Sequence, residues 1–348
     1  MSIELKYNNL GNSGLKIAPV IVGCMTYGSK DWAEWVMEDE EEIFRILKKC
    51  YDVGLRTFDT ADVYSNGKSE ELLGRFLKKY NIPRDRVVIL SKCFFPVDET
   101  TPGFNLVNRD KFPAVDYYNS QGLSRKHIFD AVENIKRRLG TYVDVLQIHR
   151  LDQSTPKREI MKALNDVVDQ GYARYIGASS MKATEFVELQ YIAQTNNWHK
   201  FISMQNYYNL IYREEEREMI PYCQKNEIGE VGIIPWSPIA RGVLARPAGK
   251  ESENKRDKSD RTFQMLHLDS LSESEKEIIG RVEILAKKHN VSMAALATSW
   301  VIGKKCNPIV GLSSVKRVDD ILVATTIELT EDEVKYLEEP YVAKASLF

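Results

Sequence analysis

The amino-acid sequence predicts an α/β fold in which eight parallel strands alternate with helices and close into a (β/α)8 barrel, the TIM-barrel fold. Eight short apolar segments, centred near residues 20, 57, 88, 145, 175, 203, 233 and 309, are each separated from the next by a helical pattern. No shift in composition divides the chain, so we expect one domain spanning residues 1–348. A doubly wound open sheet is the alternative, but no Gly-x-Gly-x-x-Gly motif follows the first strand.

Each strand and helix follows from the spacing of apolar residues. The chain opens on a glycine-flanked turn within residues 10–17, which is typical of a β-hairpin and would cap the core. Ile43, Ile46, Leu47 and Cys50 recur at helical spacing, and Gly54 ends that helix. By the same criteria we expect strands at residues 19–23, 57–59, 86–92, 142–149, 174–178, 201–206, 233–236 and 308–310. The expected helices are 40–53, a segment through Leu72 and Leu77, 126–139, 156–168, 183–194, 214–225, 273–288, 292–302, 316–324 and one begun by the capping box of Thr330 and Glu333.

Two connections are unusually long. Residues 93–123, after the third strand, are rich in Phe and Tyr, a composition suited to lining an apolar pocket. Residues 241–270, after the seventh strand, contain a charged run up to Lys258. Because long loops in a compact domain are more often functional or disordered than accidental, the second loop is either a solvated loop or a lid.

Charge, hydropathy and cysteine content argue against several classes of protein. The net charge is −2 and basic residues are interspersed with acidic ones, which disfavours nucleic acid as the main ligand. No apolar run approaches the roughly 20 residues of a membrane span, and the N-terminus has none of signal-peptide length, so we expect a soluble cytoplasmic protein. The five cysteines are far apart and never form a Cys-x-x-Cys pair, and we expect no disulfide framework and no metal site.

Four polar residues stand at or just beyond the C-terminal ends of three consecutive strands. Asp59 closes the second strand and Tyr64 follows it in a glycine-containing loop, while Lys92 and His149 end the third and fourth strands. Since these strand ends form one face of a parallel barrel, where sites are built, we expect the four side chains to meet. Taken singly, each has a structural alternative: a capping Asp, a loop-edge Tyr, a buried Lys92–Asp59 ion pair, or a strand-end His.

Together the four side chains suit proton transfer to or from an oxygen atom. A Tyr hydroxyl with a pKa of about 10 is a poor acid at neutral pH, but a nearby ammonium such as that of Lys92 lowers this pKa. Asp59 would hold the ammonium in place, and His149 would donate a hydrogen bond to the same substrate oxygen. Such a set protonates a carbonyl oxygen or removes the proton of an alcohol. It lacks the nucleophile and base of acyl transfer.

Seven segments resemble the signature segments of the aldo-keto reductase family, in the family's order along the whole chain. They are residues 59–64 (Asp-Thr-Ala-Asp-Val-Tyr), 91–92 (Ser-Lys), 147–150 (Gln-Ile-His-Arg), 176–180 (Ile-Gly-Ala-Ser-Ser), 205–206 (Gln-Asn), 235–238 (Pro-Trp-Ser-Pro) and 310–314 (Val-Gly-Leu-Ser-Ser). Residues 12–16 and 122–127 resemble the fungal aryl-alcohol dehydrogenase branch. The resemblance implies a reductase that moves a hydride from NADPH to an aldehyde or ketone, with Tyr64 as the acid in reduction and Asp59, Lys92 and His149 completing a tetrad.

The resemblance also implies where the nicotinamide end of NADPH binds. The family holds the carboxamide with residues that match Ser179, Ser180 and Gln205, and Ser180 stands where the family has an Asn. The nicotinamide ring would stack on Trp236. The pyrophosphate would lie along the segment that matches Ser237, Pro238, Ile239 and Arg241.

The adenine end of the cofactor site is implied in the same way. The family's 2′-phosphate and adenine site matches Gly311, Ser313, Arg317 and Asp320. A guanidinium at position 317 suits bidentate binding of a 2′-phosphate and therefore favours NADPH over NADH. Leu312 and Ile321 depart from a Lys and an Asn that other members carry there.

Aromatic residues in the loops suggest the kind of substrate. Trp32, Trp35, Phe94 and Phe95 stand in loops that face the site, which favours a small aromatic or other apolar carbonyl compound. The alternative from a different class is a non-catalytic, NADPH-sensing partner subunit, because channel β-subunits share this fold. Those subunits depart from the tetrad at the His position, whereas His149 is present here. The sequence leaves open the physiological substrate, the direction of the reaction and the oligomeric state.

Overall fold

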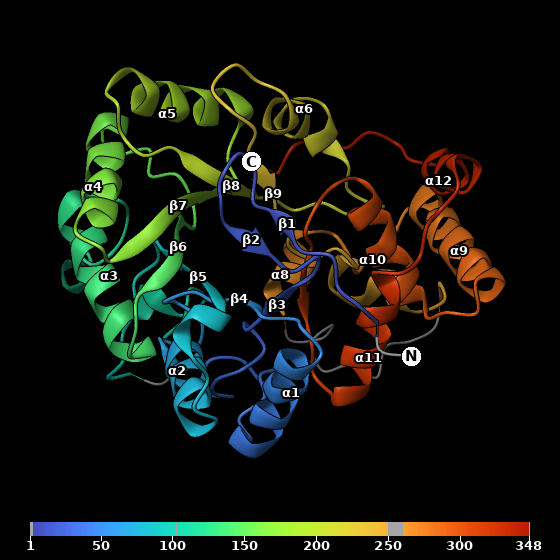
Figure 1. Cartoon of the computed structure of the whole chain (residues 1–348), viewed down its shortest axis with the longest axis horizontal. Helices are drawn as coiled ribbons and strands as arrows, with labels where there is room; N and C mark the ends of the chain where they lie inside the picture. Colours follow the sequence, from blue (N-terminus) through green and yellow to red (C-terminus); the bar gives the residue numbers. More distant parts are fainter. Residues whose placement is uncertain (1–2, 102, 250–259, 348) are drawn as a thin grey trace.

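A computed structural model describes residues 3–101, 103–249 and 260–347. Within these ranges eight parallel strands form one sheet in the order β10-β3-β4-β5-β6-β7-β8-β9, and helices surround it (Figure 1). The sheet closes on itself, because the N–H of Asn307 donates to Ile233 O at 2.9 Å and that of Ile309 to Pro235 O at 2.8 Å. These bonds join β9 to β10. The predicted (β/α)8 barrel is confirmed.

Most elements lie within one or two residues of their predicted bounds. The barrel strands are β3 (Ile21–Gly23), β4 (Thr57–Asp59), β5 (Val88–Cys93), β6 (Val143–Ile148), β7 (Ala173–Ser179), β8 (Phe201–Gln205), β9 (Gly232–Ile233) and β10 (Ile309–Gly311). The α-helices are α1 (Glu40–Asp52), α2 (Lys68–Lys79), α3 (Arg125–Leu139), α4 (Lys157–Asp169), α5 (Ala183–Thr195), α6 (Met219–Gln224), α8 (Arg261–Met265), α9 (Glu273–Lys288), α10 (Met293–Gly303), α11 (Val315–Ala324) and α12 (Glu331–Glu338).

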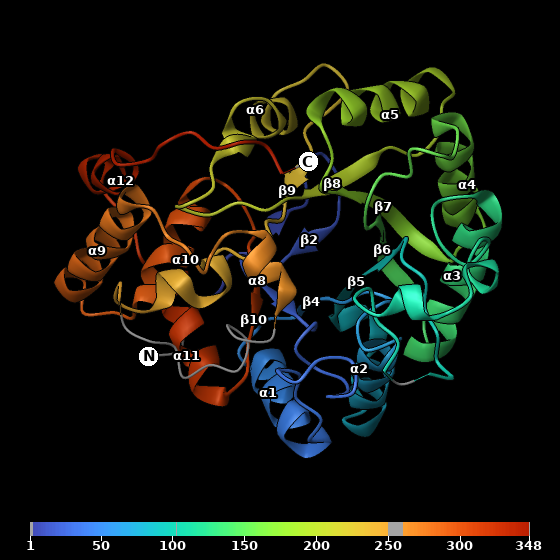
Figure 2. The same cartoon turned by 180° about the vertical axis from the view of Figure 1, so that it is seen from behind.

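The N-terminal hairpin closes one end of the barrel, as predicted. Its strands β1 (Asn8–Asn9) and β2 (Lys16–Ile17) pair antiparallel, and Leu10 and Ile17 pack inside the ring against Leu90 and Val145. Gly11 has φ 56°, and a Cβ there would lie 2.6 Å from the backbone N of Gly232, so glycine permits this close approach. The hairpin lies in front of the ring in Figure 1, whereas α8 lies in front of it in Figure 2, which shows the opposite side, so the two lie at opposite ends of the barrel.

Strand alternation separates the barrel interior from the layer under the helices. Leu90 and Val145 belong to the apolar cluster inside the ring, whereas Phe58, Ile89 and Leu146 belong to the cluster between sheet and helices. Side chains two residues further along β5 and β6 therefore also point inward, at the C-terminal end of the barrel. Because of this alternation, polar side chains lie at the C-terminal end of the barrel, next to the apolar cluster that fills its interior.

Two predicted elements are interrupted, and a proline lies in each. The seventh strand was expected over 233–236, but β9 ends at Ile233 and Trp236 forms only isolated bridges, because Pro235 has no N–H for the ladder. The helix expected over 214–225 is divided into a 3₁₀ turn, η4 (Glu214–Glu216), and α6. Pro221 would lie inside a continuous helix but falls in the first turn of α6, where a proline is tolerated.

The two long loops are partly structured. Residues 93–123 contain the 3₁₀ turns η2 (Arg109–Lys111) and η3 (Ala114–Asp116). The described parts of the second loop form the 3₁₀ segment η5 (Ala240–Ala245) and α8. Most of the charged run that we interpret as a solvated loop or a lid lies at residues 250–259, outside the described residues.

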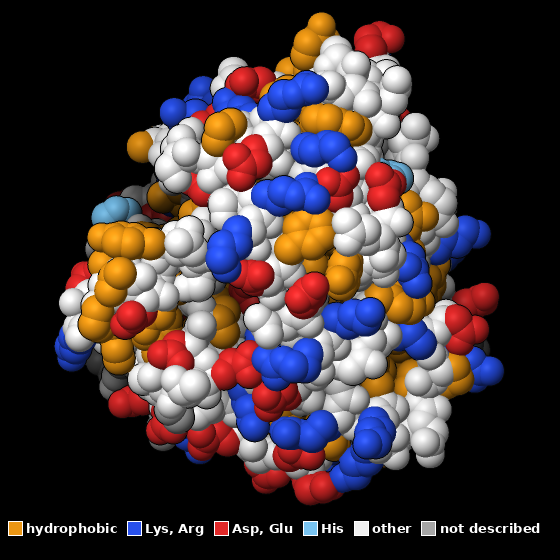
Figure 3. All heavy atoms as spheres, turned by 90° about the vertical axis from the view of Figure 1, so that its left-hand side faces the viewer, with side chains coloured by type: hydrophobic (Ala, Val, Ile, Leu, Met, Phe, Trp, Pro, Cys, Tyr) orange, Lys and Arg blue, Asp and Glu red, His pale blue; other side chains and the backbone are white. Residues whose placement is uncertain are grey.

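The outer face over α3, α4 and α5 mixes charges of both signs. Basic and acidic side chains alternate across it in Figure 3, and ion pairs join Arg125 to Asp166 and Lys157 to Glu188. On this face no single-sign surface of the kind that binds nucleic acid is formed. Among the helices of the described residues, none is both long and apolar enough to cross a bilayer.

Candidate active site

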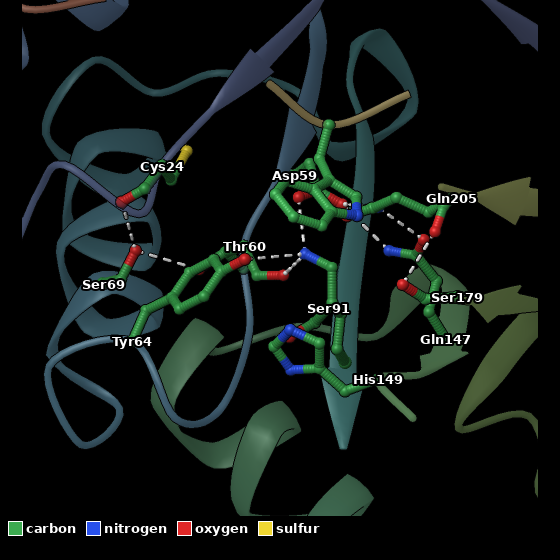
Figure 4. Close-up of polar contacts among 12 residues, drawn as sticks. Cys24, Asp59, Thr60, Tyr64, Ser69, Ser91, Gln147, His149, Ser179 and Gln205 are labelled. Atoms are coloured by element: carbon green, nitrogen blue, oxygen red, sulfur yellow. Dashed lines mark hydrogen bonds and ion pairs between the residues drawn. The ribbon is translucent and has the colours of Figure 1, made fainter. Parts of the chain in front are cut away.

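The structure brings the four predicted residues together at the C-terminal end of the barrel. Lys92 on β5 donates from Nζ to Asp59 Oδ1 at 2.5 Å, to Thr60 O at 2.8 Å and to Tyr64 Oη at 3.2 Å. The ring of His149, just after β6, lies 5.9 Å from that of Tyr64 in a T-shaped arrangement. In Figure 4 the side chains of Tyr64, Asp59 and His149 lie close together, Asp59 and Tyr64 from β4 and the turn after it and His149 from just beyond β6. All four side chains are buried.

The turn after β4 gives Tyr64 its position. Ser65, Asn66 and Gly67 have φ values of 50°, 50° and 87°, a left-handed run that Asn and Gly tolerate better than most residues. Asn66 donates from Nδ2 to Phe104 O at 2.6 Å, which ties this turn to the long loop after β5. The sequence Ser-Asn-Gly therefore turns the chain sharply and leaves Tyr64 over the barrel end.

A residue that sequence reasoning missed completes the arrangement around Asp59. Gln147 donates from Nε2 to Asp59 Oδ2 at 2.9 Å, and Gln205 donates to the same oxygen at 3.0 Å and to Gln147 Oε1 at 2.8 Å. Asp59 is thus fixed by two amides and the ammonium of Lys92. The signal for Gln147 is present in the sequence, because it lies two residues before His149 and so on the same inward face of β6.

Electrostatics set the protonation states of Tyr64 and His149. Burial raises the pKa of Tyr64, and although Lys92 acts in the opposite direction, the net shift is upward. The expectation that Lys92 lowers this pKa thus describes only its own contribution, which burial exceeds. Burial, with the charges of Lys92 and Arg150, places the pKa of His149 well below its usual value. Tyr64 is therefore protonated and His149 neutral at neutral pH, and both can donate a hydrogen bond.

Lys92 keeps its charge despite complete burial. Burial lowers the pKa of Lys92, but the adjacent Asp59 carboxylate and Tyr64 oxygen raise it by more, and the net shift is upward. The ammonium therefore stays positive throughout the neutral range. A fixed positive charge beside Tyr64 Oη stabilises any negative charge that develops on that oxygen.

A cavity of about 1620 Å³ opens above these residues. Asp59, Tyr64 and His149 line it at the barrel end. Trp32, Trp35 and Phe95 also line it, and Phe95 packs edge-on to His149 at 5.1 Å. Phe94 is not among the lining residues and packs against the core and Phe95 instead. The wall near Tyr64 and His149 is therefore largely aromatic.

The long loop after β5 contributes less aromatic surface to the cavity than its composition suggests. Phe104 is buried, stacks on Tyr117 at 4.9 Å and meets Phe112 edge-on at 5.2 Å, so these rings pack within the loop. Tyr118 is 67% exposed. The loop instead lines the cavity with Asn105, Leu106 and Val107 in addition to Phe95.

Most of the expected cofactor residues line the other part of the same cavity. The lining includes Ser179, Gln205, Trp236, Ser237, Pro238, Ile239, Arg241, Gly311, Arg317 and Asp320. Ser180 and Ser313 are not among the lining residues. Ser180 lies behind Trp236 and accepts a hydrogen bond from its Nε1 at 3.2 Å, which orients the indole. One side of that indole packs on Tyr207 at a ring distance of 4.6 Å.

The segment after β9 can accommodate an anionic group. Ser237, Ala240 and Arg241 have φ values of 54°, 47° and 54°, and the N–H of Ala240 donates to Ser237 O at 2.9 Å, so the backbone forms a tight turn beside the cavity. Arg241 is buried and pairs with Asp260, yet its Nε has no hydrogen-bond partner among the described residues. Buried polar groups usually have a hydrogen-bond partner, so this guanidinium nitrogen suits an anionic ligand such as a pyrophosphate, whose oxygens accept hydrogen bonds.

Arg317 lies in the first turn of α11, which Ser314 caps by accepting from the Arg317 N–H at 3.3 Å. An exposed guanidinium at a helix N-terminus suits a phosphate group, because both the side chain and the helix end attract negative charge. Among the described residues, no cluster of His, Cys, Asp and Glu could hold a metal ion. The lining of the cavity thus suits a long anionic cofactor and a small apolar substrate.

Comparison with known proteins establishes the class of this barrel. Residues 19–341 match the aldo/keto reductase family, and the chain belongs to that family. Its members are oxidoreductases that act on small carbonyl compounds and generally use NAD(P)H. The predicted family resemblance is therefore confirmed.

Fungal relatives are similar over nearly their whole length. The chain is 57% identical over 339 residues to the Saccharomyces cerevisiae protein named "Putative aryl-alcohol dehydrogenase AAD16", covering 97% of this chain and 98% of that one. It is 54% identical over 342 residues to versiconal hemiacetal acetate reductase of Aspergillus parasiticus, covering 98% of each. It is 45% identical over 350 residues to aldo-keto reductase AMT2 of Alternaria alternata, covering 97% and 92%.

Proposed function

We propose that this protein reduces aromatic or other apolar aldehydes and ketones to alcohols with NADPH, in the cytoplasm. The observation that carries the proposal is the Lys92 ammonium, held between Asp59 and Tyr64 at the end of a cavity lined by aromatic side chains. The relatives named putative aryl-alcohol dehydrogenase and versiconal hemiacetal acetate reductase support an oxidoreductase, and the first of these names supports an aromatic substrate.

In the proposed mechanism, Tyr64 is the general acid. The substrate carbonyl lies against the Tyr64 hydroxyl and the neutral His149 ring, which both donate to its oxygen. NADPH, when bound, supplies the hydride for the carbonyl carbon. Tyr64 gives its proton to the oxygen, and Lys92 stabilises the phenolate that results. Asp59, fixed by Gln147 and Gln205, holds Lys92 in place.

We assign the cofactor to the residues that match the family, all of which line the cavity except Ser180 and Ser313. Ser179, Ser180 and Gln205 would hold the carboxamide, although in this structure the amide of Gln205 donates to Asp59 and the hydroxyl of Ser179 donates to Gln205 O at 2.9 Å. Trp236 would stack on the nicotinamide ring. Residues Ser237, Pro238, Ile239 and Arg241 would bind the pyrophosphate, and Gly311, Ser313, Arg317 and Asp320 the adenine nucleotide end.

The experiment that tests the proposal is NADPH consumption at neutral pH with aromatic, aliphatic, sugar and keto substrates, with NADH in parallel. We expect turnover of aryl aldehydes with NADPH. Absence of turnover with every substrate, together with tight NADPH binding, would contradict the enzyme proposal. It would favour the alternative, a non-catalytic sensor subunit, which the presence of the complete tetrad otherwise disfavours.

Arg317→Ala is expected to raise the Kd of NADPH by about 10- to 100-fold while leaving that of NADH nearly unchanged. A charge-assisted pair with a phosphate is worth about 1.5–3 kcal/mol, and NADH lacks the 2′-phosphate. Titration of both cofactors by tryptophan fluorescence measures the effect. Lys316→Ala, on the neighbouring exposed position, serves as the control. An equal loss of affinity for both cofactors would exclude the 2′-phosphate role.

The kcat/KM of reduction is expected to be flat between about pH 7 and 9. Tyr64, with its pKa raised above 10, keeps its proton over this range, and His149, with its pKa well below 6.5, stays neutral. Because neither group changes protonation state, neither contributes a limb to the profile. The measurement is initial rates in a constant-ionic-strength buffer series. A tenfold fall towards pH 9 would show that Tyr64 titrates in the neutral range.

A further inference from the structure

The long loop after β5 presents two apolar side chains to water at the mouth of the cavity. Leu106 and Val107 are 41% and 49% exposed, and both line the same cavity as Tyr64 and His149. Apolar surface that is exposed beside a ligand cavity is often part of the surface that the ligand covers. The proposed proton transfer does not involve these two residues, so their place at the mouth concerns the part of the substrate away from its carbonyl.

The turn that carries the two residues is fixed by its own hydrogen bonds. Asn105 Oδ1 accepts from the N–H groups of Val107 at 2.9 Å and Asn108 at 3.1 Å. Asn108 Oδ1 accepts from the N–H of Asn105 at 2.9 Å, and Asn108 Nδ2 donates to Gly103 O at 2.7 Å. Both asparagine side chains therefore hold the backbone of the turn from which Leu106 and Val107 extend.

Two further contacts place this turn beside the reacting groups. Asn66, in the turn that carries Tyr64, donates from Nδ2 to Phe104 O at 2.6 Å. Asn105 donates from Nδ2 to Trp32 O at 3.4 Å, and the ring of Trp32 lies 6.5 Å from that of Tyr64. Trp32 thus links the proton donor to the turn, and all three line one cavity. A flat substrate that extends from Tyr64 along Trp32 reaches the apolar residues of the turn.

The charges at the mouth favour an uncharged extension. Asp31 and Glu34 flank Trp32 in the chain, are exposed and also line the cavity. Their carboxylates disfavour an anionic group on the distal part of the substrate. Leu106 and Val107 gain free energy only from an apolar group that removes their surface from water. The distal group that fits this surface is therefore neutral and apolar.

We propose that the turn of residues 103–108 binds a second apolar ring of the substrate, so that the preferred substrates are aromatic carbonyl compounds with two or more rings. The ring that bears the carbonyl packs on Trp32 beside Tyr64, and the second ring covers Leu106 and Val107. This proposal rests on the proposed carbonyl reduction and specifies its substrate class. Leu106 and Val107 are then specificity-determining residues, and the tetrad performs the same chemistry on one ring or two.

The test compares substrates that differ in one ring. The kcat/KM with NADPH is measured for benzaldehyde, 2-naphthaldehyde and biphenyl-4-carbaldehyde. Wild type is expected to prefer at least one two-ring aldehyde over benzaldehyde by about tenfold, because full burial of an apolar group the size of a Phe ring contributes about 10- to 100-fold and the turn covers one side of it. Leu106→Asn combined with Val107→Thr should lower this ratio by about 5- to 10-fold. Both positions are exposed, so the fold should be unaffected.

A matched control separates the turn from the rest of the loop. Val115→Thr changes a residue that is 70% exposed in the same loop but lines no part of the cavity, and it should leave the ratio unchanged. A loss common to all three aldehydes reports a change at the tetrad or in cofactor binding, so only the ratio counts. No preference for either two-ring aldehyde in wild type, or a preference that the double variant keeps, would overturn the proposal.

Binding of benzamide and biphenyl-4-carboxamide in the presence of NADP⁺, followed by isothermal titration calorimetry, gives a readout that does not depend on turnover. Tighter binding of the biphenyl amide that the double variant abolishes supports the second-ring site even if no aldehyde is reduced. In that case the proposed carbonyl reduction fails and the second-ring site stands. Equal binding of the two amides by wild type contradicts the second-ring site whatever the activity.

Discussion

Tyr64→Phe is expected to lower kcat for aldehyde reduction by about 10²- to 10⁴-fold, the usual contribution of a positioned proton donor. The variant loses only the hydroxyl that lies 3.2 Å from Lys92 Nζ. The ring is retained, and so are its contacts with Trp32 at 6.5 Å and His149 at 5.9 Å. The shape of the cavity and the affinity for NADPH should therefore be unchanged.

Three measurements test this expectation. Steady-state kinetics give kcat and KM, fluorescence titration gives the Kd of NADPH, and thermal unfolding shows whether the fold is intact. Tyr117→Phe is the matched control, since that hydroxyl bonds to Asp98 at 3.3 Å in the loop and lines no part of the cavity. Turnover of Tyr64→Phe within threefold of wild type would mean that another group protonates the carbonyl.

The parts of the fold that were predicted correctly depend on local sequence. Apolar segments alternating with helical patterns gave the barrel, and the capping box of Thr330 and Glu333 starts α12 as expected. The interruptions occur at prolines. At Pro235 the missing N–H ends β9 early, and at Pro221 the helix begins again so that the proline lies in its first turn. Both prolines are visible in the sequence, but the spacing of apolar residues alone does not show where a proline interrupts a strand or a helix.

The candidate site could also be predicted from the sequence only in part. Asp59, Lys92 and His149 were found because strand ends in a parallel barrel share one face. Gln147 obeys the same two-residue alternation but has no titratable group, and it was missed. Phe95 lines the cavity and Phe94 does not, and this difference depends on where the chain leaves β5. The direction of the pKa shift of Tyr64 depends on how deeply its side chain is buried. Neither quantity can be obtained from residue spacing.

The second large effect concerns a buried charge network behind the turn that carries Tyr64. Arg138 on α3 donates from Nε to Glu70 Oε2 at 2.6 Å and from Nη1 to Glu99 Oε1 at 2.6 Å, and Ser91 donates to the other oxygen of Glu70. Glu70 is fully buried, and the Arg138 side chain is only 2% exposed. Gly67 packs directly on Arg138, since a Cβ there would lie 2.4 Å from its Cδ.

Arg138→Met is expected to reduce the free energy of unfolding by about 3–5 kcal/mol, because removing one partner leaves the Glu70 carboxylate buried without its cation. Burial already raises the pKa of Glu70, and Arg138 counteracts this. Without Arg138 that pKa rises further above its value in the unfolded chain. The folded variant then binds its proton more tightly than the unfolded chain, so its stability falls as pH rises from about 5 to 8.

Urea unfolding of the wild type and variants at pH 5 and pH 8 measures this effect. Arg137→Met is the matched control, because Arg137 pairs with the same Glu99 but is 56% exposed, and such surface pairs contribute at most about 1 kcal/mol. Adding Glu70→Gln to Arg138→Met removes the stranded charge and should restore stability at pH 8 more than at pH 5. If Arg138→Met cost no more than Arg137→Met at pH 8, the network would contribute little to folding. The turn that carries Tyr64 would then be held by its own left-handed residues and by the bond from Asn66 to the long loop.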